Sequence, residues 1–151
     1  MKIKLLIIIS LLIGICTIFC LKMNNNNKFN LDSIYYERDK FIAIDSSELD
    51  NLLNNKKSFI LYPYNNYCTF KVSCDEIFIN SIKELNITIL KIPFDEFKNN
   101  ILYNEIKYAP SIILIKEGKI ITYLDPNKDE NLSKYQDSKQ FTSWIKEYIN
   151  I

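Results

Sequence analysis

The sequence predicts an α/β fold, a mixed β-sheet flanked by helices. Short runs of β-branched and aromatic residues alternate with segments of helical periodicity, which is typical of parallel strands joined by right-handed crossovers. The last two strand-like runs are separated only by Glu117-Gly118, a tight turn that joins antiparallel strands. Ahead of these elements, residues 5–21 form an almost wholly apolar run, which predicts one separate N-terminal helix.

The first predicted elements are two strands and the helix between them. Residues 41–44 read as a short strand, and residues 59–62 as a second one that is rich in aromatic and β-branched side chains. Ser47 with Asp50 three residues later resembles a capping box, so we expect the first helix to begin there. The helix should end at residues 54–55, a pair of asparagines.

The middle of the domain predicts a helix, a strand and a second helix. Apolar side chains recur at helical spacing after the cysteine segment, at Ile77, Phe78, Ile82 and Leu85. Residues 87–92 read as a strand that Pro93 stops, and residues 94–106 as a helix. We expect three side chains of this helix to face the core, namely Phe97, Ile101 and Leu102.

The last part predicts a hairpin and a closing helix. Residues 112–115 and 119–124 are its two strands, and residues 125–136 read as a polar loop. Asp137 with Gln140 suits a helix start. One face of the closing helix is apolar, formed by Phe141, Trp144, Ile145, Tyr148 and Ile149.

Composition restricts the function. The 151-residue chain has a net charge of +1 and no histidine. Its lysines are scattered, whereas nucleic-acid-binding proteins usually carry a clustered basic patch. Without histidine, the two cysteines outside the apolar run are too few soft ligands for a metal site. We therefore expect no metal, no cofactor and no nucleic-acid partner.

The chain divides into three parts. Residues 1–22 predict a signal anchor or a signal peptide, residues 23–39 a polar linker, and residues 40–151 the folded domain. An anchor is favoured because no small-x-small cleavage site follows the apolar run. Cleavage stays open as the alternative and would give a secreted protein.

The apolar run also predicts location. Roughly 20 apolar residues span a bilayer, so residues 5–21 are barely long enough to cross the membrane once. Lys2 and Lys4 favour a cytoplasmic N-terminus. The domain would then lie outside the cytoplasm at the cell membrane, where disulfides persist. Cys16 and Cys20 fall inside the run and read as apolar filler.

Cys68 and Cys74 are the cysteines that can carry chemistry. They lie between a predicted strand and a predicted helix, where the helix N-terminus stabilises a thiolate. Five residues separate them, instead of the two of a standard dithiol motif.

Taken together, the element order and three local features resemble the thioredoxin-like superfamily over residues 41–151. Cys68 follows the aromatic run Phe59-Ile-Leu-Tyr-Pro-Tyr-Asn-Asn-Tyr67, at the place of the family's attacking cysteine. Ala109-Pro110 stands where the family has its cis-proline, and Lys116-Glu-Gly-Lys119 is similar to its hairpin turn. Within the aromatic run, Tyr64 and Tyr67 occupy positions where thioredoxins usually have tryptophan.

The resemblance implies a thioredoxin fold with a cis Ala109-Pro110 bond. The backbone beside this bond would pair with an extended partner chain next to Cys68, so protein or peptide thiols and disulfides are the expected partners. The chain departs from the family at Cys68-Thr-Phe-Lys71, which lacks the second cysteine of Cys-Gly-Pro-Cys. It also departs at Tyr62, which replaces a buried acidic residue.

Whether Cys68 and Cys74 can pair depends on where the helix begins. In a regular helix their Cα atoms would be roughly 10 Å apart, beyond the ~7 Å limit for a disulfide. Ser73-Cys-Asp-Glu76, however, reads as a capping box, and a helix starting there leaves Cys68 in a loop that can fold back. Alternatively, Cys74 belongs to one continuous buried stripe and is a core residue.

Two functions follow from these alternatives. In the first, a thiol-disulfide oxidoreductase uses Cys68 as nucleophile and Cys74 as resolving cysteine, and Lys71 lowers the pKa of Cys68. Tyr64, Tyr67 and the Ala109-Pro110 edge would line its substrate groove. In the second, a non-catalytic binding or accessory module, for example for peptide export, uses the same edge to hold a partner.

Overall fold

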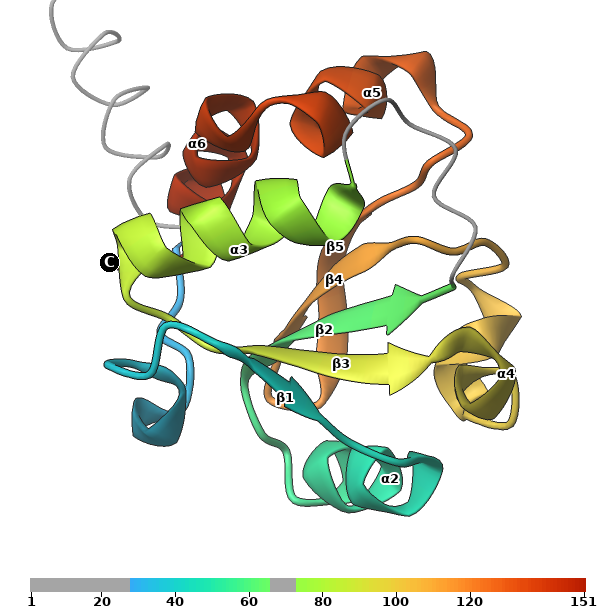
Figure 1. The fold of residues 1–151 in the computed structure, drawn as a ribbon. Helices are drawn as coiled ribbons and strands as arrows, with labels where there is room; N and C mark the ends of the chain where they lie inside the picture. The colour runs from blue at the N-terminus through green and yellow to red at the C-terminus, as the bar shows by residue number, and fades with distance from the viewer. Residues whose placement is uncertain (1–27, 66–72) are drawn as a thin grey trace, which may run out of the picture.

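The computed structural model describes residues 28–65 and 73–151, which form a five-stranded mixed sheet (Figure 1). The strand order is β1-β3-β2-β4-β5. The strands are β1 (Phe41–Ala43), β2 (Phe59–Tyr64), β3 (Ile89–Pro93), β4 (Ile112–Lys116) and β5 (Lys119–Leu124). β3 runs parallel to both β1 and β2, whereas β4 pairs antiparallel with β2 and with β5. The mixed sheet and the closing hairpin predicted from the sequence are therefore confirmed.

Helices cover both faces of the sheet. The α-helices are α2 (Ser46–Asn54), α3 (Cys74–Leu85), α4 (Phe94–Phe97), α5 (Asp129–Gln136) and α6 (Ser138–Tyr148). Two short 3-10 helices, η1 (Ser33–Tyr35) and η2 (Ile101–Asn104), complete the described elements. Figure 1 shows α3, α5 and α6 on one side of the sheet and α2 and α4 on the other. The three layers place the ends of β2 and β3 between two helical surfaces.

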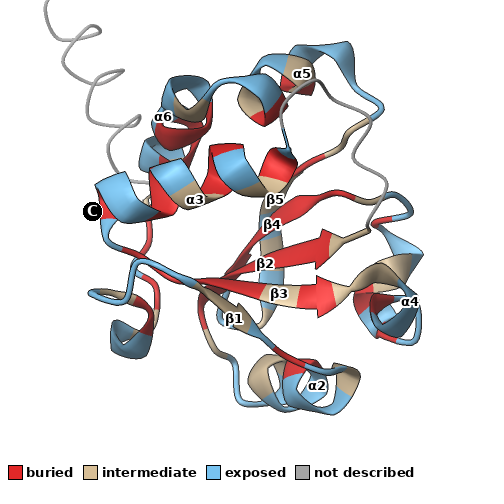
Figure 2. Cartoon of the chain, in the orientation of Figure 1, coloured by how far each residue is buried: buried red, intermediate tan, exposed pale blue. Residues whose placement is uncertain are grey.

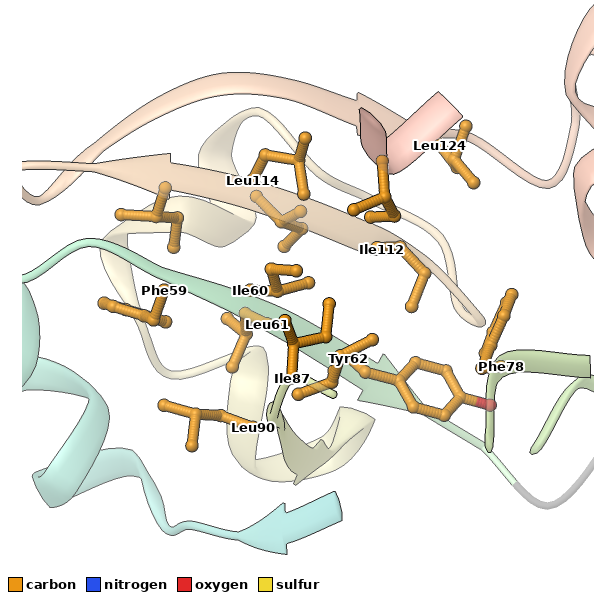
Figure 3. Packing of buried hydrophobic residues seen from close by; sticks show 14 of the residues in the cluster. Phe59, Ile60, Leu61, Tyr62, Phe78, Ile87, Leu90, Ile112, Leu114 and Leu124 are labelled. Carbon is orange, nitrogen blue, oxygen red and sulfur yellow. The ribbon is translucent and has the colours of Figure 1, made fainter. Parts of the chain in front are cut away.

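The core is continuous through the central strands. The first five residues of β2 and the first four of β4 are buried, which is the near-unbroken apolar pattern of strands covered on both faces (Figure 2). The aromatic rings of Tyr62 and Phe78 meet edge to face with centroids 5.2 Å apart (Figure 3). This contact connects the end of β2 to the first turns of α3, and so fixes the position of that helix start.

The first helix begins with a different cap from the predicted one. Asp45, not Ser47, is the N-cap: its Oδ1 accepts from the Glu48 backbone N–H at 2.8 Å. The Glu48 carboxylate in turn accepts from the Asp45 N–H at 3.0 Å. The predicted box of Ser47 and Asp50 was wrong because Asp45 and Glu48 form the same three-residue spacing two residues earlier.

The single helix predicted over residues 94–106 was also wrong. The chain forms only the one-turn α4 and the 3-10 turn η2, separated at Asn100. Buried Asn100 accepts from the Leu102 N–H at 2.9 Å and donates to Asp50 at 2.6 Å. Because an asparagine side chain that bonds its own backbone competes with helix continuation, the segment breaks there. Ile101, expected to point inward, is 71% exposed.

Residues 125–136 form more structure than the expected polar loop. α5 occupies Asp129–Gln136 and buries only Asn131 and Tyr135. With two buried side chains, one of them polar, the segment shows no apolar stripe from which a helix could be predicted. The predicted start of the following helix at Asp137 is confirmed, since its carboxylate accepts from the Lys139 N–H at 2.8 Å.

The folded domain starts earlier than position 40. Phe29 is 4% exposed, and its backbone exchanges hydrogen bonds with Tyr148 and Asn150 at 2.8 and 2.9 Å. Leu31 and Tyr35 are buried as well. Residues 28–39, which were expected to belong to a linker, are thus part of the domain.

The predicted N-terminal apolar segment, with Cys16 and Cys20, lies outside the described residues. Across 28–65 and 73–151 no helix is both long enough and apolar enough to span a bilayer.

Candidate functional site

The loop between η2 and β4 contains the expected cis peptide bond, Ala109-Pro110. Pro110 is buried and Ala109 is half-buried. The Ser111 N–H donates to the Pro63 carbonyl at 3.2 Å, which attaches the loop to the end of β2. The cis-proline predicted from the sequence therefore lies beside the strand that leads to the cysteine segment.

Side-chain donors occupy all three carbonyls of this cis-proline loop (residues 108–110). The Ser111 hydroxyl donates to the Tyr108 carbonyl at 2.7 Å, and the Asn65 amide donates to the Ala109 carbonyl at 2.9 Å. The Tyr135 hydroxyl lies 2.8 Å from the Pro110 carbonyl. The loop is thus held by the residue that follows β2, by the serine that follows the loop and by α5.

Tyr135 is a residue that sequence reasoning missed. Its hydroxyl lies 2.8 Å from the Leu124 carbonyl as well as from that of Pro110, so the one proton is shared between the end of β5 and the loop. Burial, and secondarily the charge of Asp125, raise the pKa of Tyr135 well above its usual value. Its hydroxyl therefore stays a donor at neutral pH. No signal in the polar segment around it predicted this role.

Cys74 is the first residue of α3, with Ser73 as N-cap. This is the helix start required by the pairing alternative. The Ser73 side chain makes no capping hydrogen bond, so the predicted Ser73–Glu76 capping box is not formed. Cys74 is fully buried and disulfide-bonded, and its partner lies outside the described residues. Three predicted site residues, Tyr67, Cys68 and Lys71, also lie outside them.

The residue after Cys74 joins a charged network. Asp75 accepts from the Tyr62 hydroxyl at 2.9 Å with one oxygen and forms an ion pair with Lys91 through the other. An unpaired acidic residue in this first turn would oppose a nearby thiolate. Because Lys91 neutralises it, the carboxylate adds little net negative charge to the first turn of α3. Lys91, which alternation along β3 did not single out, is the missed partner.

Aromatic rings surround the ammonium of Lys91. Its Nζ lies 4.2 Å from the centroid of Tyr64, 5.2 Å from that of Phe41 and 5.3 Å from that of Tyr62. Such contacts stabilise a cation in a partly desolvated site. Tyr64, predicted to line a substrate groove, is half-buried and packs on this lysine.

The hydroxyl of Tyr62 is the third member of the network. Burial and the neighbouring charge of Asp75 both raise the pKa of Tyr62 far above its ordinary value. Tyr62 therefore remains protonated and donates to Asp75 throughout the physiological range. The Tyr62 hydroxyl thus connects β2 to an acidic residue of α3.

A small open pocket adjoins the cis-proline loop. Its lining combines two tyrosines with charged side chains and comprises Glu105, Ile106, Lys107, Tyr108, Ser111, Tyr123 and Asp125. Tyr108, directly before Ala109, is 55% exposed. A partner chain lying along the loop would have this pocket beside it. Within the two described stretches, no three acidic or cysteine side chains gather in a way that could hold a metal ion.

Comparison with solved structures agrees with the element order. A point mutant of a thioredoxin from Halobacterium salinarum NRC-1 superposes with a TM-score of 0.54 at 14% identity, covering 75% of this chain and 94% of that one. Oxidised thioredoxin O1 from Arabidopsis thaliana is also similar, with a TM-score of 0.42 at 20% identity over 62% of this chain and 95% of that one. No protein-family model and no curated protein matches the sequence. The sheet order, the cis-proline and the first of these superpositions establish that the chain has a thioredoxin-like fold.

Proposed function

We propose that the protein is a thiol-disulfide exchange protein in which Cys68 attacks and Cys74 resolves. The observation that carries the proposal is the disulfide-bonded Cys74 at the first position of α3, in a fold of thioredoxin type with a cis-proline loop. We take Cys68 as its disulfide partner, because a helix that begins at Cys74 leaves the preceding residues outside the helix. The distance between their Cα atoms is then not fixed at the roughly 10 Å that a regular helix imposes.

The exchange balances as two thiolate displacements. The Cys68 thiolate attacks one sulfur of a substrate disulfide, and the second substrate sulfur leaves as a thiolate that takes up a proton. The Cys74 thiolate then attacks Cys68 in the mixed disulfide and releases the remaining substrate sulfur. The substrate gains two electrons and the protein becomes the Cys68–Cys74 disulfide, or the same steps run in reverse.

Neighbouring groups support thiolate formation at Cys68 and the positioning of the substrate. The N-terminus of α3 favours negative charge, and Lys71 would add a positive charge near Cys68 and lower the pKa of its thiol. The pairing of Asp75 with Lys91 removes an opposing charge from the same helix turn. Ala109-Pro110 would position the backbone of the substrate, with Tyr64 and Tyr67 beside it.

The proposed location is the outer side of a cell membrane. Residues 5–21 would anchor the chain, and the domain would lie where disulfides persist. Cleavage of the segment would leave the same domain as a secreted protein.

Alkylation of the full reduced chain as a function of pH tests the mechanism. Mass spectrometry after brief exposure to iodoacetamide reports each cysteine separately. The proposal predicts that Cys68 reacts with an apparent pKa below the ~8.5 of an ordinary cysteine, and that Lys71→Met moves this value upward. A Cys68 that titrates as an ordinary thiol, with no response to Lys71→Met, contradicts a nucleophilic role.

A second function is favoured by the exposed surface beside the cis-proline. Tyr108 and the adjoining pocket suit a module that holds a partner chain without chemistry, such as an accessory protein of peptide export. In that case the disulfide would be a structural crosslink. Cys68→Ser separates the two proposals, since it abolishes exchange in the first and leaves partner binding intact in the second.

A further inference from the structure

The hydrogen-bonding groups of the cis-proline loop are unevenly occupied. Its three carbonyls, of Tyr108, Ala109 and Pro110, each lie within hydrogen-bond distance of a side-chain donor. The Ala109 N–H makes no hydrogen bond to any of the described residues, and Pro110 has no N–H. The Ala109 N–H thus remains available to a partner, whereas the carbonyl of the same residue already has a donor.

An extended chain pairs with a residue through both of its backbone groups. In an antiparallel hydrogen-bonded pair, the two residues exchange N–H···O bonds in both directions. A partner residue opposite Ala109 would accept from its N–H and donate to its carbonyl. The Asn65 amide, 2.9 Å from that carbonyl oxygen, stands where the second of these bonds would form.

We propose that Asn65 determines which extended chains dock on the cis-proline loop. Its side-chain amide substitutes for the partner's N–H at the Ala109 carbonyl, so the loop favours a partner residue that supplies only a carbonyl. Proline is the natural residue of this kind, since it lacks an N–H. The inference rests on the docking role of the cis-proline edge, which both proposed functions share.

The placement of Asn65 fits this role. It directly follows Tyr64, the last residue of β2, and the Ser111 N–H holds the loop against Pro63 of the same strand. The loop therefore keeps its attachment to β2 when the Asn65 side chain changes rotamer or is truncated. Such a change uncovers the Ala109 carbonyl and leaves the Ala109 N–H in place.

The test compares peptide docking to the wild-type chain and to Asn65→Ala. The probe is a phage library of random decapeptides without cysteine, selected separately on each protein. The best binders are synthesised with a single N-methyl group at each position in turn, and the shift of the Ala109 amide signal in NMR spectra identifies peptides at the loop. Asn150→Ala is the matched control, because it removes an exposed asparagine amide that donates to Asn30 instead.

We expect peptides selected on Asn65→Ala to bind that variant about two- to tenfold more tightly than wild type, the value of one hydrogen bond. N-methylation at one position should erase the difference, and peptides selected on wild type should carry proline there. Asn150→Ala should behave as wild type. Equal affinities, a difference that survives every N-methylation, or no peptide that shifts the Ala109 signal in either protein would overturn the inference. Cysteine alkylation is measured separately, so failure here is distinct from failure of the exchange mechanism.

Discussion

At the scale of single residues, three side chains form a charged network at the first turn of α3, the helix that begins with Cys74. Asp75 comes from the first turn of α3, Tyr62 from β2 and Lys91 from β3. The sequence could not show this arrangement, because Asp75 lies 13 positions from Tyr62 and 16 from Lys91. The three residues meet only when the strands and the helix assemble. Their contacts give two testable predictions.

Replacing Lys91 by methionine should destabilise the fold. The variant keeps an unbranched apolar side chain but loses the ion pair with Asp75 and the cation held over Tyr64. We expect a loss of about 1–2 kcal/mol in the free energy of unfolding, measured by urea denaturation. Lys119→Met, at an exposed position of β5, is the control. An equal effect of both substitutions would show that the network is not stabilising.

The raised pKa of Tyr62 predicts a particular alkaline behaviour. The unfolded chain loses the tyrosine proton near pH ~10, whereas the folded protein holds it to higher pH. The contribution of this group is therefore complete below about pH 10 and is lost as the pH rises. Tyr62→Phe should make the fall of unfolding free energy with rising pH shallower by about 1.4 kcal/mol per pH unit above pH ~10.5. Denaturation at several pH values checks this, with Tyr108→Phe at an exposed ring as control, and an unchanged slope in Tyr62→Phe would contradict it.

At the scale of elements, the sequence pattern and the structure place the N-cap of α2 at different residues, Ser47 and Asp45. Asp45→Ala should cost about 1 kcal/mol of stability because it removes the N-cap acceptor of Glu48 N–H. Ser47→Ala, at the start expected from sequence, should cost close to nothing. Thermal or urea denaturation of the pair decides between the two caps, and the reverse ranking would refute the cap seen here.

The elements that sequence reasoning predicted are those with an apolar pattern of their own. The strands around Phe59 and Ile112 and the face of α6 around Trp144 carry such patterns, and each was found. The misses lie where one polar side chain decides the backbone, as at Asn100, or where packing fixes a polar helix through a single tyrosine, as in α5. At the site, the cis-proline was predictable by resemblance, whereas Tyr135 and Lys91 were not.

At the scale of the whole molecule, the domain is closed by the segment that precedes β1. Phe29 packs beside the C-terminal end of α6, so residues far apart in sequence meet there. Phe29→Ala should destabilise the protein by about 3–5 kcal/mol, as expected for a large core side chain, whereas Ile34→Ala, at a 55% exposed side chain, should be nearly neutral. Urea denaturation measures both. If Phe29→Ala left the free energy of unfolding unchanged, residues 28–39 would be a linker and not part of the domain.

The central claim is that Cys68 and Cys74 form one reversible dithiol. A redox titration of the full chain against mixtures of reduced and oxidised dithiothreitol, read by alkylation and peptide mass spectrometry, tests it most directly. We expect both cysteines to change state together, in a single two-electron transition, with a Cys68–Cys74 crosslink in the oxidised form. Cys68→Ser should abolish the transition. A crosslink from Cys74 to a different cysteine, or two cysteines that titrate independently, would contradict the account.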